Sequence, residues 1–304
     1  MSNKSILITG GTGFLGTALT FQCLQQNYQV TVLGRSSDKI IRAFGNQVKA
    51  VTGIEDLPDA GSFYAVVNLA GAGIFDQRWN AARKHVLRQS RISLTQQLVD
   101  WIARSDAVPT VLVSGSAIGF YGEHGDETLT ETSQPKPDFS QQLCADWEQV
   151  ALQAETMNTR VCLIRTGLVL GVGGGLLKRM LLPFRLGLGG RLGTGQQWMS
   201  WIHLKDWLAI VQLMIDNPAL QGAYNATAPA PVTNQVFSAT LAAVLKRPML
   251  MPLPEIGLKL LLGEMAELVL GSQRVMPQRL LEAGFLFQYP QLEPALHNVL
   301  TSQK

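Results

Sequence analysis

Cysteine is scarce in this sequence, and the cysteines that are present stand far apart. Cys23, Cys144 and Cys162 are odd in number and show no Cys-x-x-Cys spacing. These features argue against a disulfide framework and against a zinc site, and they fit a reducing compartment. We therefore expect a cytoplasmic protein without a bound metal.

Charge and long apolar runs are also limited. Charged residues make up 15% of the chain and the net charge is +3, with the lysines and arginines scattered along it. A nucleic-acid binder would instead concentrate basic residues on one surface. The apolar stretch 256–262 is far too short for a membrane span, and glycines interrupt the first apolar segment too early for a signal peptide. The sequence therefore favours neither nucleic acid nor membrane as a partner.

The apolar residues follow two alternating patterns. Short β-rich runs, which predict strands, occupy residues 5–9, 29–33, 65–69, 110–114 and 160–165. Segments in which apolar residues recur every three to four positions lie between them, at 15–26, 81–104 and 141–155. This alternation is typical of an α/β protein with a Rossmann-type, doubly wound parallel sheet.

The second half of the chain differs in composition. Residues 171–195 are rich in glycine, leucine and arginine, which predicts a loop with a short helix that covers a substrate. A strand-and-helix unit is expected at 201–213, and Pro229 and Pro231 then precede a helical tail. We predict a Rossmann domain with substrate-side loops over residues 1–228 and a smaller C-terminal, substrate-side domain over residues 229–304.

The most specific local signal is a glycine pattern between the first predicted strand and the first predicted helix. The segment TGGTGFLG places Gly10, Gly13 and Gly16 three residues apart. In this context Gly10 permits a tight turn, Gly13 lets the backbone approach phosphates, and Gly16 allows close packing of helix on strand. The free N–H groups at the start of the helix would then bind a pyrophosphate. The alternative is an ordinary glycine turn.

A second signal follows the next strand, about twenty residues further on. Proteins that bind NAD place a carboxylate there for the ribose 2′-hydroxyl, but this chain has Arg35 followed by Ser36 and Ser37. A guanidinium beside two hydroxyl groups suits a 2′-phosphate, so the sequence favours NADP. The alternative is a solvated surface arginine.

Five segments in this order, TGGTGFLG, VVNLAGAGI, SGSAIGFYG, LIRTGLVLG and SWIHLKD, carry a family resemblance. They resemble the extended short-chain dehydrogenase/reductases, which are NAD(P)-dependent epimerases and dehydratases. The later segments AYNATAPAPVTN and LGEMAELVLGSQRVMPQRL are similar to the YfcH-type branch of this epimerase family, which carries a small C-terminal domain of unknown function. Together the motifs cover nearly the whole chain.

The resemblance implies further cofactor contacts at the ends of the later strands. Arg91, which ends a basic run on the predicted helix 81–104, could also reach the cofactor or an anionic substrate, and its alternative is a solvated helix face. Taken together, the predicted cofactor-binding residues are Gly10, Thr12, Gly13, Phe14, Leu15, Gly16, Arg35, Ser36, Leu69, Ala70, Gly71, Arg91, Ser114, Thr166, Gly167, Leu168 and Val169.

The chain departs from the superfamily at the catalytic pair. The resemblance implies a Tyr-x-x-x-Lys motif in which lysine lowers the tyrosine pKa and holds the ribose, but Ser140 and Cys144 occupy those positions. A serine without a neighbouring base cannot act as an acid or base near neutrality. We predict Ser116 and Tyr121 as substitute catalytic residues. For Tyr121 the alternative is a packed aromatic at a strand end.

Two functions therefore remain open. The first is an NADP(H)-dependent oxidoreductase or epimerase-like enzyme that acts on a small carbonyl or hydroxyl compound. The second is a catalytically silent NADP-binding sensor or interaction protein. A small-molecule substrate and a homodimer are the expected partners.

Overall fold

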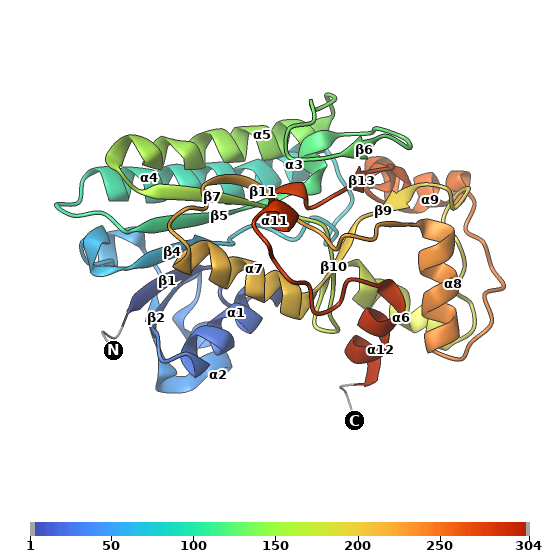
Figure 1. Cartoon of the computed structure of the whole chain (residues 1–304), viewed down its shortest axis with the longest axis horizontal. Helices are drawn as coiled ribbons and strands as arrows, with labels where there is room; N and C mark the ends of the chain where they lie inside the picture. The colour runs from blue at the N-terminus through green and yellow to red at the C-terminus, as the bar shows by residue number, and fades with distance from the viewer. Residues whose placement is uncertain (1–3, 302–304) are drawn as a thin grey trace.

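A computed structural model of the chain describes residues 4–301, and its centre is a seven-stranded parallel sheet (Figure 1). The strand order is β11-β7-β5-β4-β1-β2-β3. The chain adds β2 and β3 on one side of β1 and then returns to add β4, β5, β7 and β11 on the other side. The strands are β1 (Ser5–Thr9), β2 (Gln29–Leu33), β3 (Val48–Val51), β4 (Ala65–Asn68), β5 (Val111–Ala117), β7 (Arg160–Thr166) and β11 (Gly222–Ala226). This is the doubly wound Rossmann-type fold that the alternating pattern predicts.

Helices cover both faces of this sheet (Figure 1). One apolar core lies under α1 (Phe14–Gln25), α2 (Ser37–Phe44) and α7 (Leu204–Asp216). The opposite core lies under α4 (Leu94–Ala103) and α5 (Phe139–Leu152). The interior residues of β1, β4, β5 and β7 are buried on both faces of the sheet, so they form short apolar runs rather than an alternating pattern.

The five predicted strands of the first half are present. The sequence patterns do not predict the strands β3 and β11, the helix α2 or most of the short strands, and the expected helix 81–104 is two helices. These are α3 (Ala81–Arg88) and α4, joined by one turn of π-helix at Gln89–Ser93. Inside an α-helix a π turn inserts an extra residue and redirects the side chains around it, so the basic run does not follow a single helical face.

A smaller core lies at one end of the sheet (Figure 1). It combines α6 (Gly175–Arg185), β8 (Leu168–Leu170) and β10 (Trp201–His203) with α8 (Asn234–Val244) and α12 (Leu292–Thr301). The predicted boundary after residue 228 therefore crosses a shared core, and the two-domain division stays a prediction about folding units.

Short elements connect this end to the sheet. The strand β13 pairs with β6, and β12 pairs with β9. Their bounds are β6 (Thr128–Leu129), β9 (Trp198–Met199), β12 (Val232–Thr233), α9 (Glu255–Leu262), α10 (Glu267–Leu270), β13 (Arg274–Val275) and α11 (Gln278–Glu282). Among residues 4–301, no helix has both the length and the apolar character that crossing a membrane requires.

Candidate cofactor and active site

The glycine turn lies at the carboxyl end of β1, where the chain enters α1. Gly10 has a φ of +67°, a left-handed conformation that glycine adopts without strain, and the Gly13 N–H donates to the Gly10 carbonyl oxygen at 2.9 Å. A Cβ atom on Gly16 would clash with that same oxygen. Since Gly13 has no side chain to cap α1, the first N–H groups of α1 can bind an anion such as a diphosphate.

The end of β2 lies beside this turn, because β1 and β2 are neighbouring parallel strands. Arg35 follows β2 and is exposed to solvent. Ser36 is the N-cap of α2, and its Oγ accepts a hydrogen bond from the Lys39 N–H at 3.4 Å. An exposed guanidinium next to a helix N-terminus is an electrostatic environment that favours an anion.

The end of β4 borders the turn on its other side. A Cβ atom on Gly10 would lie 2.7 Å from the Leu69 carbonyl oxygen, so the two segments are in direct contact. Beneath them, Thr9 Oγ1 donates to Asn68 Oδ1 at 2.7 Å, and Asn68 Nδ2 donates to Thr95 Oγ1 at 2.7 Å. This buried chain of hydrogen bonds fixes the ends of β1 and β4 against α4.

Arg91 reaches the same edge from the π turn. Its guanidinium packs against Gly71, where a Cβ atom would lie 2.9 Å from Arg91 Cζ. Arg91 Nη2 also donates to the Ala72 carbonyl oxygen at 3.1 Å. Two residues predicted from separate signals, Gly71 and Arg91, are therefore in contact.

Two serines end the next strand, β5. Ser114 is fully buried, and its Oγ has no hydrogen-bond partner within residues 4–301. Ser116 Oγ donates to Glu148 Oε1 at 2.6 Å. Arg165, from β7, donates to the same carboxylate through Nε at 2.9 Å and Nη2 at 2.8 Å. Since the Ser116 proton points to Glu148, the Ser116 hydroxyl keeps only its lone pairs for another group.

Tyr121 is fully buried beside this network. Its hydroxyl donates to Asn225 Oδ1 at 2.7 Å and accepts from Arg165 Nη1 at 3.1 Å. Burial raises the pKa of the Tyr121 phenol, although Arg165 offsets part of that rise. These contacts favour a structural role, and the role of Tyr121 as a proton donor stays a prediction.

The positions of the missing tyrosine and lysine lie on α5. A Cβ atom on Gly119 would lie 3.2 Å from the Ser140 Cβ and 3.8 Å from the Cys144 Sγ, so both side chains face the segment that follows β5. Burial raises the pKa of the Cys144 thiol to about 12. The thiol is therefore neutral near pH 7 and is not an activated nucleophile.

The remaining predicted residues follow β7. Thr166 ends that strand, and its Oγ1 accepts from Trp207 Nε1 at 3.1 Å. Leu168 and Val169 continue into β8, and Gly167 between them and Thr166 lies against the Ser200 carbonyl oxygen. Thr166 is thus held by a hydrogen bond and Gly167 by a close packing contact, and their approach to a nicotinamide stays a prediction.

The glycine-rich stretch after β8 folds back onto the first turn of α1. Cβ atoms on Gly171, Gly173 and Gly174 would each contact the Phe14 ring. The residues predicted from the first turn and those predicted from β8 therefore border a common region at the carboxyl ends of the strands. Open parallel sheets bind their ligands at this edge.

Glu148, Asn68 and Thr95 are site residues that the sequence interpretation did not include. Glu148 offers the clearest signal, because it stands on the buried face of α5 between Cys144 and Ala151. A carboxylate on an apolar helix face needs a partner. That the partner is Arg165 depends on how α5 packs against the sheet.

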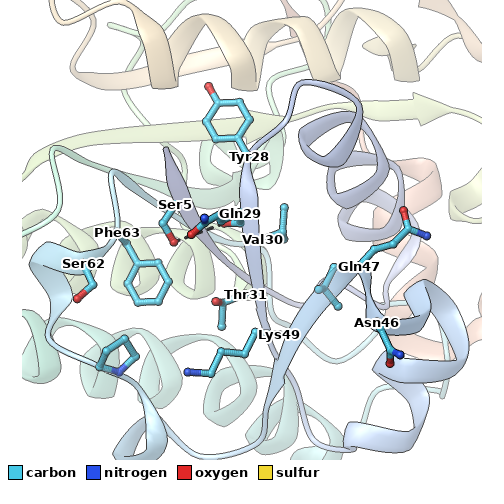
Figure 2. A pocket seen from close by; sticks show the side chains of 12 residues that line it. Ser5, Tyr28, Gln29, Val30, Thr31, Asn46, Gln47, Lys49, Ser62 and Phe63 are labelled. Atoms are coloured by element: carbon cyan, nitrogen blue, oxygen red, sulfur yellow. Dashed lines mark hydrogen bonds between the residues drawn. The ribbon is translucent and has the colours of Figure 1, made fainter. Parts of the chain in front are cut away.

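A hollow of about 520 Å³ lies elsewhere, over the amino ends of β1, β2 and β3 (Figure 2). Its lining includes Ser5, Gln29 and Val48, the first residues of these strands, together with Thr31 and Lys49. This hollow is at the opposite edge from the glycine turn, so we do not assign it to the cofactor. No cluster of three or more His, Cys, Asp or Glu side chains suited to a metal occurs within residues 4–301.

Residues 6–227 match the NAD dependent epimerase/dehydratase family, and residues 253–299 match a domain of unknown function, DUF1731. The chain belongs to the NAD-dependent epimerase/dehydratase family. Within that family its sequence is 40% identical to the "Epimerase family protein SDR39U1 homolog, chloroplastic" of Arabidopsis thaliana, over 98% of this chain and 87% of that protein. An epimerase family protein of Staphylococcus haemolyticus is 38% identical, over 98% of this chain and 99% of the relative.

Solved structures of the epimerase family agree with the fold. The human epimerase family protein SDR39U1 (isoform 2), crystallised with NADPH, superposes with a TM-score of 0.87 at 32% identity and covers 98% of this chain and 99% of its own. A nucleoside-diphosphate sugar epimerase from Corynebacterium glutamicum superposes with a TM-score of 0.79 at 30% identity, over 98% of this chain and 58% of its own. The recognised motifs and the Rossmann-type fold are thus confirmed.

Proposed function

We propose that this epimerase-family protein binds NADP(H) and transfers hydride to or from a small carbonyl or hydroxyl compound. The observation that carries the proposal is the charge at the end of β2. Arg35 is an exposed cation at the position where NAD-binding proteins carry a carboxylate, and it adjoins the N-terminus of α2. The human relative crystallised with NADPH supports the same preference.

In the proposed complex, the ends of different strands contact different parts of the cofactor. Arg35 and Ser36 bind the adenosine 2′-phosphate, and the first turn of α1 binds the diphosphate through Gly10, Thr12, Gly13, Phe14, Leu15 and Gly16. The end of β4 lines the adenosine-ribose and diphosphate side with Leu69, Ala70 and Gly71, and the ends of β5 and β7 lie near the nicotinamide with Ser114, Thr166, Gly167, Leu168 and Val169. Arg91 is a further proposed cofactor contact, from the π turn.

Ser116 is our proposed ligand-contacting group in catalysis. Its hydroxyl donates to Glu148, whose carboxylate also accepts two hydrogen bonds from Arg165. Because Arg165 fixes the carboxylate in place, we infer that Glu148 positions the Ser116 hydroxyl. Tyr121 remains the second proposed catalytic residue, and its release from Asn225 would be required before it could reach a ligand.

A second candidate function is NADP(H) binding without turnover, as in a sensor or interaction protein. The observation that favours it is the pair Ser140 and Cys144, which supplies neither a phenol nor a cation at the expected catalytic positions. Incubating the protein with NADPH and a panel of aldehydes and ketones separates the two functions. Loss of absorbance at the nicotinamide band supports the enzyme, and tight binding without oxidation supports the silent protein. A homodimer stays a prediction for both.

The test of cofactor choice is a titration of the protein with NADPH and with NADH. We expect tighter binding of NADPH, and we expect Arg35→Asp to weaken NADPH binding by about 10- to 100-fold, because a charge-assisted hydrogen bond contributes roughly 1.5–3 kcal/mol. The affinity for NADH should change little. Arg104→Asp, at the exposed end of α4, changes the net charge equally and serves as the control. Equal affinity of the wild type for both dinucleotides would refute the NADP preference.

A further inference from the structure

Arg83 places a charge on the apolar face of α3. Leu87, one helical turn further on, is buried in a small apolar cluster together with Trp79, and residues four apart share a helical face. The Nε atom of Arg83 is buried as well, and it has no hydrogen-bond partner within residues 4–301. A buried guanidinium nitrogen without an acceptor is costly, so this position favours a ligand that supplies one.

The carboxylates around α3 do not compensate this charge. Lys84 pairs with Glu264, and Arg88 pairs with Asp146 at 2.5 Å. No Asp or Glu oxygen of the described chain lies within 4.0 Å of a nitrogen of the Arg83 guanidinium. The charge of Arg83 is therefore available to a ligand anion.

The backbone of the loop after β4 holds the Arg83 guanidinium in place. Its Nη2 donates to the Gly73 carbonyl oxygen, which also accepts a hydrogen bond from the Asp76 N–H at 3.3 Å. The Asp76 carboxylate itself pairs with Arg179 of α6 at 3.6 Å. Since a guanidinium has about five N–H donors, the contact with Gly73 orients the group and leaves donors for a ligand.

Arg91, a proposed cofactor contact, lies close to this group. Its Nη2 donates to the Ala72 carbonyl oxygen at 3.1 Å, one residue before the carbonyl that Arg83 contacts. Burial lowers the pKa of Arg91, and the charge of Arg83 lowers it as well, so the two cations repel each other. An anion bound beside Arg83 would offset this repulsion.

The loop after β4 leads from the cofactor edge towards the C-terminal part of the chain. Its first residues touch the glycine turn at Gly10, and its later residue Phe75 packs in the same cluster as Leu262 and Met265. Arg83 contacts the loop at Gly73, between these two regions. A ligand that binds here extends from the cofactor edge towards the C-terminal part.

We propose that Arg83 binds an anionic group, a carboxylate or a phosphate, of the small carbonyl or hydroxyl substrate. This inference rests on the proposed function, because it names the substrate class of the same site. Arg83 is already oriented by Gly73, so little side-chain entropy is lost when the anion binds. The anion belongs to the substrate because Arg83 contacts the loop two residues beyond Gly71, further along the chain from the glycine turn than the residues proposed for the cofactor.

The first experiment compares substrates that differ only in the anionic group. The pairs are succinic semialdehyde with butanal, which tests a carboxylate, and glyceraldehyde 3-phosphate with glyceraldehyde, which tests a phosphate. We expect NADPH oxidation to prefer the anionic member of at least one pair. Arg83→Met should lower kcat/KM for that member by about 10- to 100-fold and change kcat/KM for the neutral member by less than about twofold. Arg104→Met is the matched control and should change neither value.

The second experiment measures binding, so that the test does not depend on turnover. Succinate and inorganic phosphate are titrated separately into the NADPH-saturated protein and followed by calorimetry. We expect Arg83→Met to raise the Kd of at least one of these anions by about 10- to 100-fold. The Kd of NADPH should stay within about twofold of the wild type, which separates a substrate contact from a cofactor contact.

Two results overturn the proposal. One is equal affinity of the wild type and Arg83→Met for both anions, and the other is a loss of NADPH affinity in Arg83→Met without a loss of anion affinity. If Arg83→Met does not fold, Arg83→Gln replaces it, because the amide can still donate to the Gly73 carbonyl oxygen without carrying a charge. Failure of the wild type to bind NADPH would refute the proposed function itself, and titration of the two anions without NADPH would still test Arg83.

Discussion

The buried pair of Glu148 and Arg165 is the residue-scale feature on which the end of β5 depends. Both side chains are about 5% exposed, and they share two hydrogen bonds. Burial alone would lower the pKa of Arg165, but the hydrogen bonds and the charge of Glu148 raise it overall. The pair also orients Ser116 and contacts the Tyr121 hydroxyl, so it links the fold to the proposed site.

Glu148→Gln should destabilise the protein strongly. The amide keeps the size of the side chain but leaves Arg165 buried without a counter-ion, which costs about 3–5 kcal/mol. Urea unfolding followed by fluorescence measures this loss. The exposed Glu293, 3.9 Å from His297, provides the control, and Glu293→Gln should cost less than about 0.5 kcal/mol. If the double variant Glu148→Gln with Arg165→Met were no more stable than Glu148→Gln alone, the unpaired charge would not be the cause.

At this scale the sequence predicts residues whose role depends on local context. Gly10, Gly13 and Gly16 could be assigned because strand, turn and helix follow one another directly. Glu148 could not be paired with Arg165, because the two meet only when α5 packs on β7. Arg91 is predicted to lie close to the crevice, but the periodicity of residues 81–104 predicts one continuous helix and does not reveal the π turn at Gln89–Ser93.

At the scale of elements, α7 begins at a buried histidine. His203 is the N-cap, and its Nδ1 accepts a hydrogen bond from the Lys205 N–H at 3.0 Å. The ring also stacks on Tyr289, with centroids 3.9 Å apart. Burial lowers the pKa of His203 to about 4, so the ring is neutral at physiological pH and remains an acceptor for the cap.

This cap predicts a pH dependence of stability. The unfolded chain binds a proton at His203 near pH 6.5 and the folded chain only near pH 4. The contribution of the neutral His203 to the free energy of unfolding is therefore fully present above pH 6.5 and is lost as the pH falls towards 4. The loss amounts to roughly 3 kcal/mol. His203→Asn retains a capping acceptor that does not titrate. The stability of this variant relative to the wild type should therefore rise as the pH falls through this range.

Chemical denaturation at several pH values between 7.5 and 4 measures that difference. The control is His297→Asn, because the side chain of His297 is 54% exposed. Its stability should change with pH almost in parallel with the wild type. A constant difference between His203→Asn and the wild type from pH 7.5 to 4 would contradict the cap mechanism.

Elements were predictable where composition and periodicity agree. The strands β1 and β2 have the predicted bounds because they are short runs of β-branched and apolar residues. The strand β3 contains a lysine, and β11 reads GAYNA, so neither has the composition of a strand. Pairing with β2 and with β7 makes them strands, which is information that a single segment does not contain.

At the scale of the whole molecule, the C-terminal part completes the core of the first part. Phe184 of α6 and Trp201 of β10 are buried in one cluster with Phe237 of α8 and Leu296 of α12. The Asp206 carboxylate, fully buried in α7, also accepts hydrogen bonds from the backbone N–H groups of residues 288 and 289 at 2.7 and 3.0 Å. The region 229–304 therefore contributes to the folding of residues 168–206.

A chain that ends at residue 228 should consequently be much less stable than the full chain. It loses Phe237, Leu241 and Leu296 from the shared core, and burial of three such side chains contributes about 5–9 kcal/mol, which is comparable to the total stability of many domains. We expect residues 1–228 to unfold at a markedly lower temperature and to bind an apolar fluorescent dye. Addition of a separately expressed 229–304 segment should restore part of the loss. A melting temperature equal to that of the full chain would instead establish residues 1–228 as an independent domain, with the C-terminal part as an appendage whose packing contributes little.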